Sequence, residues 1–506
     1  MSCLSLLLTL ITFSAPFQGA DLVKDFKRYF KKYEDTATRV EAVLALEEIE
    51  RPEVAEVLAP ILADGDGAVV RACERVLSEF RTEPPIARVA ELLGKSKKTP
   101  VRVGLLHAIA EGGYGTAADA VEPLLEDQRP EVRRAALVTW AALRGGDAVE
   151  ALLALVEDKD DAVRSAALDA LAGIGSPAVV PAAIANLDHG SWPVRASAIS
   201  ALAKVRSRDS IAPLIERLGK EEGRLQEDIG EALDAITGKS LGRRLSAWES
   251  FWERFGDEYQ IPTDEELAAM RASRAASRRA YGEGEPGSVS YHGIETPSRS
   301  ILFVIDVSGS MEQEVVDRER YADGGYPSFR RIDIVKTELA RTIDHLEPYV
   351  RFNVLTFATE LRFWKKGLVP ANPLYRSSAV EFVSKLDAIG GRSLEGRGPA
   401  AALVAADMAA GKTNTYGALM AALGVDGRRS KKKAKPDAWV DTIFFLSDGR
   451  PSVGEYIDTD DIRAEVRREN ETRRIVIHTL AIGEFERGFM KSLALESGGV
   501  YVDLGK

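Results

Sequence analysis

The sequence is poor in the residues that form disulfides or bind soft metals, because its 506 residues include only 2 cysteines and 5 histidines. Cys3 lies near the start of the chain and Cys73 lies far from it. If Cys3 is removed with a leader, Cys73 has no partner within the chain. The fold is therefore expected to depend on packing and not on disulfides.

Long hydrophobic runs are also scarce. The exception is residues 3–13 (CLSLLLTLITF), which small residues follow as far as Gly19 and Ala20. This run has the length of a signal-peptide core and is too short to span a bilayer. We predict a signal peptide over residues 1–20 and export to the periplasm or the cell exterior, with a cytoplasmic location as the alternative. No transmembrane segment is expected.

Positive charge is in deficit. The chain has 67 Lys and Arg against 78 Asp and Glu, a net charge of -11. General nucleic-acid binding needs a basic surface, so this class of partner is excluded. A hydrophobic share of 45% and a charged share of 29% are typical of globular proteins, and the length allows two to four domains.

A repeat with a period of 31 residues organises the first half of the chain. Its arginine column comprises Arg71, Arg102, Arg133, Arg164 and Arg195, and apolar residues recur four and seven positions later. Such spacing marks one face of a helix, and each unit is long enough for two short helices. Stacked units of this kind form an α-solenoid. The sequence resembles short HEAT-like repeats over residues 36–237.

The resemblance predicts a HEAT-like helical repeat domain over residues 21–256. We expect the arginine column to join repeats through carboxylates or carbonyl oxygens at helix ends, rather than to bind a ligand. Some families with short HEAT repeats bind iron through His-Glu pairs, but no histidine here precedes a glutamate. The aromatic cluster that begins at Trp248 (WESFWERF) is interpreted as a terminal cap of the repeats.

Residues 257–295 are predicted to be a helical and flexible linker. Thr263 to Glu266 (TDEE) is typical of a helix N-terminus, and the glycine-rich stretch from Gly282 to Ser290 is typical of a flexible segment.

Strand and helix patterns alternate from Arg299 onward. Apolar runs at residues 301–306, 352–359, 442–449 and 475–483 predict buried strands, and residues 331–346 have helical periodicity. Further helices are expected after Gly411 and Asp460. This order predicts a doubly wound, Rossmann-like α/β domain over residues 296–506, with a parallel sheet and a ligand crevice beyond the carboxyl ends of its strands.

Oxygen-bearing side chains stand in three loops of this predicted domain. Asp306, Ser308 and Ser310 follow the first strand, Thr413 precedes a helix, and Asp448 follows a later strand. Carboxylate and hydroxyl oxygens suit one hard divalent cation, with Mg²⁺ favoured and Mn²⁺ or Ca²⁺ as alternatives. No His or Cys belongs to the set, which argues against zinc.

This pattern resembles the metal-ion-dependent adhesion site of von Willebrand factor A (VWA) domains, in which Asp-x-Ser-x-Ser is followed by a Thr and then by an Asp. All five positions are matched. The resemblance implies that Ser308, Ser310 and Thr413 contact the metal directly, while Asp306 and Asp448 act through water. It also implies that a Glu or Asp of a partner protein fills the last coordination position.

The favoured hypothesis is a metal-dependent adhesion or scaffold protein without catalytic activity, in which the repeats offer a surface for a second protein. The alternative is a VWA subunit of an ATPase-driven chelatase or assembly machine, which would need a separate ATPase. A hydrolase is disfavoured because no paired catalytic carboxylates, Ser-His-Asp arrangement or metalloprotease helix can be assembled.

Overall fold

The computed structural model describes residues 15–278, 289–291, 293–389, 411–425, 440–483 and 487–504. The chain forms two compact units, Met1–Ala151 and Leu152–Lys506. Most of the predicted signal peptide and of the glycine-rich linker lies outside the described residues. The helix α1 (Ala15–Tyr29) includes Ala20, the last residue of the predicted signal peptide. Within the described part of the chain, no helix has the length and apolarity needed to cross a membrane.

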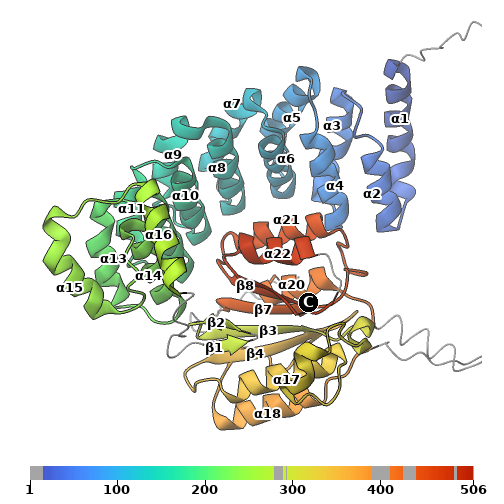
Figure 1. Cartoon of the computed structure of the whole chain (residues 1–506). Coiled ribbons are helices and arrows are strands. Elements are labelled where there is room, and N and C mark those ends of the chain that lie inside the picture. Colours follow the sequence, from blue (N-terminus) through green and yellow to red (C-terminus); the bar gives the residue numbers. More distant parts are fainter. Residues whose placement is uncertain are drawn as a thin grey trace, which may run out of the picture. The chain divides into compact units, whose positions relative to one another are not determined.

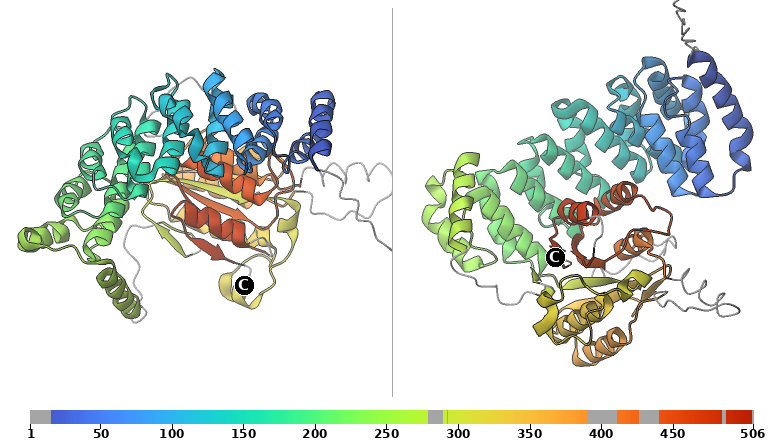
Figure 2. Two further views of the ribbon diagram at one scale, coloured as in Figure 1. Left: turned by 90° about the horizontal axis from the view of Figure 1, so that it is seen from above. Right: turned by 45° about the vertical axis from the view of Figure 1, so that its right-hand side comes forward.

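The first unit consists of helices that lie side by side in successive pairs (Figure 1, Figure 2). After α1 they are α2 (Thr36–Leu44), α3 (Pro52–Leu58), α4 (Gly67–Ser78), α5 (Glu83–Lys95), α6 (Thr99–Gly112), α7 (Ala118–Val121), α8 (Pro130–Arg144) and the start of α9 (Val149–Leu155). A glycine in the repeat permits close packing here. A Cβ atom on Gly104 would lie 2.9 Å from the Leu62 side chain, so a glycine here lets α6 pack on the segment containing Leu62 without displacing that side chain.

The second unit begins with further helices of the repeat. They are α10 (Asp161–Ile174), α11 (Val179–Asn186), α12 (Trp192–Val205), α13 (Ile211–Leu218), α14 (Arg224–Thr237), α15 (Leu245–Phe255) and α16 (Asp264–Arg278). The Asp160 side chain caps α10 by accepting the N–H groups of Ala162 and Val163. The Thr263 and Glu266 side chains accept each other's backbone N–H groups at the start of α16, which confirms the predicted helix N-terminus.

The arginine column makes internal hydrogen bonds, as predicted. Arg133 and Arg195 donate from Nη1 to carbonyl oxygens six residues earlier, at 2.7 and 2.9 Å, and Arg102 and Arg164 do so from Nε at 2.6 Å each. Several also reach the following repeat, as in the 2.6 Å ion pair between Arg195 and Glu221. These guanidinium groups therefore hold the turns of the repeats in place.

The rest of the second unit contains a seven-stranded sheet, with strand order β5-β4-β3-β7-β8-β9 and β6 paired with β4. Its strands are β3 (Ser300–Asp306), β4 (Arg351–Phe357), β5 (Leu361–Phe363), β6 (Val369–Pro370), β7 (Thr442–Ser447), β8 (Val476–Ala481) and β9 (Tyr501–Asp503). A separate hairpin joins β1 (Val289–Tyr291) and β2 (Ile294–Thr296). The fold is therefore helical repeats followed by a Rossmann-like α/β domain.

The sheet is not parallel throughout, which corrects the prediction at one edge. Strands β3, β4, β7, β8 and β9 pair in parallel, whereas β5 and β6 are antiparallel to β4. The connection from Phe357 to Leu361 is too short for a crossover, so the chain must turn back beside the strand it has just left.

Helices cover both faces of the sheet. Figure 1 shows α17 (Arg331–Asp344) and α18 (Pro373–Ser384) on one face, and α21 (Thr459–Asn470) and α22 (Arg487–Glu496) on the other. The core beneath α17 contains Ile301, Phe303 and Ile305 of β3, all fully buried. Successive residues of a strand point to opposite faces of the sheet, so β3 is packed on both sides. This packing holds the end of β3 firmly in place.

His478 in β8 is expected to make folding sensitive to acid. It is 6% exposed, its Nδ1 accepts the Val500 N–H at 3.0 Å, and burial lowers its pKa to about 4. Since the unfolded value is near 6.5, the unfolded chain binds the extra proton first as pH falls, and stability declines between these two values. When the pH falls from 7 to 4.5, we expect this residue to lower the free energy of unfolding by about 2–3 kcal/mol.

Chemical unfolding at both pH values tests this expectation. His478→Asn keeps an acceptor near Val500 but cannot be protonated, so it should lose less stability on acidification than the wild type. His345→Asn, at an exposed position, is the control and should behave like the wild type. Equal acid sensitivity in all three proteins would contradict the assignment to His478.

Candidate functional site

The candidate site lies at the carboxyl ends of β3 and β7, two neighbouring parallel strands. Asp306 is the last residue of β3, and Asp448 directly follows β7. Because parallel strands end at the same edge of a sheet, the two carboxylates are brought together although they are far apart in sequence. The loop after β3 continues into a short 3₁₀ helix, Gly309–Glu312, which contains Ser310.

Asp306 is fully buried and both of its carboxylate oxygens are fixed. Oδ1 accepts the backbone N–H of Ser308 at 2.8 Å, and Oδ2 accepts the Ser447 hydroxyl at 2.6 Å. These bonds tie the end of β3 to the end of β7 and shape the loop that carries the two serines. Asp306 therefore acts as an anchor for the loop.

Asp448 is 5% exposed and also has a partner at each oxygen. The Ser310 hydroxyl donates to Oδ1 at 2.6 Å, and Nη1 of Arg331 donates to Oδ2 at 2.7 Å. The Ser308 and Ser310 hydroxyl oxygens lie 3.1 Å apart. A continuous set of polar contacts thus joins four of the five predicted ligands.

Thr413 completes the set through the loop before α20 (Thr415–Leu423). The backbone N–H of Gly309 donates to the Gly411 carbonyl at 3.0 Å and joins this loop to the one after β3. A Cβ atom on Gly449 would lie 3.2 Å from the hydroxyl oxygens of both Ser310 and Thr413, and 3.9 Å from that of Ser308. The three hydroxyls therefore surround one space, which stays open because residue 449 has no side chain.

The acidic side chains of the site outnumber the basic ones, because Asp306 and Asp448 lie beside a single arginine, Arg331. Burial, and next the charge of Asp448, raises the pKa of Asp306 to about 7. Burial also raises the pKa of Asp448, although Ser310 and Arg331 act in the opposite direction. The donor set of hydroxyl and carboxylate oxygens fits a hard divalent cation such as Mg²⁺.

Sequence analysis missed three residues that shape the site, namely Arg331, Ser447 and Gly449. Ser447 and Gly449 flank Asp448, so their position offered a signal. The sequence offers no such signal for Arg331, because this residue begins a helix in a different part of the chain. Thr415, the first residue of α20, is 1% exposed and its hydroxyl has no hydrogen-bond partner among the described residues.

A Rossmann-like sheet with an Asp-x-Ser-x-Ser loop at a strand end, joined by a Thr and an Asp, defines the VWA class of domain. Comparison with known families agrees, because residues 328–503 match the von Willebrand factor type A domain. Residues 86–172 and 149–234 match HEAT repeats. The chain therefore carries HEAT repeats followed by a VWA domain. The matched VWA range begins after the loop that contains Asp306, Ser308 and Ser310.

Relatives resemble part of the chain. It is 28% identical over 209 residues to inter-alpha-trypsin inhibitor heavy chain H4 of Homo sapiens. This match covers 41% of this chain and 18% of that protein. The corresponding heavy chain 4 of Mus musculus is 27% identical over 208 residues, again 41% and 18%. The chain thus matches less than a fifth of the length of these relatives.

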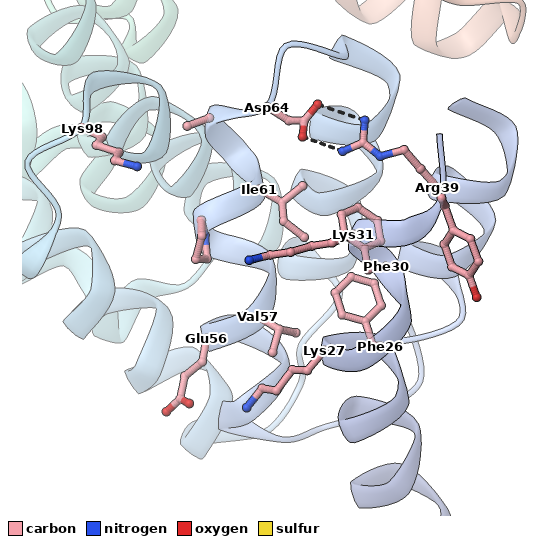
Figure 3. A pocket seen from close by; sticks show the side chains of 13 residues that line it. Phe26, Lys27, Phe30, Lys31, Arg39, Glu56, Val57, Ile61, Asp64 and Lys98 are labelled. Atoms are coloured by element: carbon pink, nitrogen blue, oxygen red, sulfur yellow. Dashed lines mark hydrogen bonds and ion pairs between the residues drawn. The ribbon is translucent and has the colours of Figure 1, made fainter. Parts of the chain in front are cut away.

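The first unit contains a hollow of about 680 Å³ next to α1 and α3, seen in Figure 3. Phe26, Phe30 and Ile61 are among the residues that line it, and a 2.5 Å ion pair between Arg39 and Asp64 closes one side. Phe26 and Phe30 are largely buried and stack on each other. These two rings therefore serve mainly as packing between helices.

Proposed function

We propose that this protein recognises partner proteins through one divalent cation, Mg²⁺ being favoured over Mn²⁺ and Ca²⁺, and that it is not an enzyme. Ser308, Ser310 and Thr413 would bind the ion directly, and Asp306 and Asp448 would act through water. An acidic residue of the partner would complete the coordination shell. One observation carries the proposal: the hydroxyls of Ser308, Ser310 and Thr413 lie around the space beside Gly449, and the Ser310 hydroxyl donates to the buried Asp448.

A non-catalytic role is supported by the names of the relatives, which are chains of an inhibitor. The HEAT repeats support a second interaction surface, since helical repeats present extended faces to partners. Export is supported by the apolar run at residues 3–13.

The proposal is tested by calorimetric titration of the full chain with Mn²⁺, a spectroscopically convenient substitute for Mg²⁺. We expect one saturable site per chain. Gly449→Ala should weaken binding by about tenfold or more, because its methyl group would enter the space between Ser310 and Thr413; ligand shells tolerate small displacements poorly.

Gly488→Ala is the matched control, since a Cβ atom on Gly488 would have no neighbour within 4 Å. It should bind Mn²⁺ like the wild type. Absence of saturable binding in the wild type, or equal binding in the Gly449→Ala protein, would contradict the proposed metal site.

A further inference from the structure

Arg331 is a buried cation beside the candidate metal site. It is 7% exposed, and its Nη1 donates to Asp448 Oδ2 at 2.7 Å. A Cβ atom on Gly483 would lie 3.1 Å from Cζ of Arg331 and 3.2 Å from its Nη1. The guanidinium therefore occupies a space that exists because residue 483 is glycine.

The backbone and neighbours of Arg331 fix this position. Its N–H donates to the Gln313 carbonyl at 2.9 Å, and the next residue, Ile332, is fully buried. The adjacent Arg330 forms ion pairs elsewhere, with Asp333 at 2.8 Å and Glu312 at 2.9 Å. Arg331 is thus a positive charge that its ion pair holds close to Asp448, on a backbone that is fixed at the start of α17.

This positive charge changes the electrostatic balance of the site. When both carboxylates are ionised, the net charge of Asp306, Asp448 and Arg331 is minus one. A bound divalent ion would change this net charge to plus one. Without Arg331 the two carboxylates would neutralise the ion completely. At low effective dielectric an excess charge within a few ångströms is costly, and it is relieved when an anion binds.

We propose that Arg331 couples binding of the metal ion to binding of a partner's carboxylate. It disfavours the ion alone, because the loaded site then carries an uncompensated positive charge. It favours the ion together with a carboxylate, because that group restores neutrality. This inference rests on the proposed function and makes Arg331 a residue that determines specificity for acidic partners.

The test is Mn²⁺ titration of the full chain in acetate and in chloride at equal ionic strength, with acetate as the carboxylate probe. Acetate should raise the Mn²⁺ affinity of the wild type by a factor in the range of roughly 5–150, the usual range for coupled sites. In Arg331→Gln, Mn²⁺ should bind more tightly in chloride than in the wild type, and the acetate effect should fall towards one. Arg331→Lys keeps the charge and should retain most of the effect.

An unchanged acetate effect in Arg331→Gln would overturn the inference. So would loss of Mn²⁺ binding in both buffers by a folded Arg331→Gln protein, because the guanidinium would then only support the structure. Near-ultraviolet circular dichroism establishes folding, and Arg331→Met serves as a second neutral variant if Gln is not tolerated. If the wild type binds no Mn²⁺ in either buffer, the proposed function fails together with this inference. If the wild type binds Mn²⁺ and acetate raises the affinity of Arg331→Gln by the same factor, only the coupling is refuted.

Discussion

Asp306→Asn is expected to weaken Mn²⁺ binding by about 10–100-fold, the loss typical when a residue that orients metal ligands is changed. Asn keeps the size of the side chain but removes its charge. It also places an NH₂ group where a carboxylate oxygen now accepts the Ser308 N–H or the Ser447 hydroxyl. The loop that carries Ser308 and Ser310 should therefore lose both an anchor and a source of negative potential.

Calorimetric titration of the full chain measures this effect. Asp460→Asn is a matched control, because this aspartate lies in α21 of the same domain with its side chain 80% exposed. The control should bind Mn²⁺ as the wild type does. Undiminished binding by a folded Asp306→Asn protein would show that Asp306 has no part in holding the ion.

Trp248→Ala is expected to lower the unfolding free energy of the repeat region by about 3–5 kcal/mol, as for other fully buried tryptophans. Trp248 is 0% exposed, and its indole N–H donates to the Gly242 carbonyl at 2.8 Å. Its removal would leave a cavity and an unpaired carbonyl near the end of the repeats.

Phe255→Ala provides the comparison, because Phe255 lies in the same helix, α15, and is 50% exposed. It should cost less than about 1 kcal/mol, as exposed positions usually do. Denaturant unfolding followed by far-ultraviolet circular dichroism distinguishes the two variants. Similar losses for both would contradict a packing role for Trp248 in the aromatic cluster that is interpreted as the terminal cap of the repeats.

Much of the fold could be predicted because its elements require a periodic spacing of residue types in the sequence. The arginine column locates the repeats, since a helix that packs on its neighbours needs the same residue types at the same step. Four strands of the sheet, β3, β4, β7 and β8, were predicted from continuous apolar runs, because burial on both faces requires such runs. The predicted strand at residues 301–306 differs from β3 by one residue, Ser300.

The candidate site was predictable only in part. Asp306 and Asp448 could be placed together because parallel strands end at one edge. Arg331 could not be placed, because its proximity to Asp448 depends on how α17 packs and on the missing side chain of Gly483. The antiparallel edge strands β5 and β6 are short and only partly buried, so they leave no strong apolar pattern.

The arginine column also bears on how the length of such a chain can change during evolution. Each of Arg102, Arg133, Arg164 and Arg195 closes a turn within its own repeat, by bonding to a carbonyl six residues earlier. A duplicated or deleted block of 31 residues would carry its own closing bond with it. We expect that adding or removing one such block would leave the turn bonds of the remaining repeats intact.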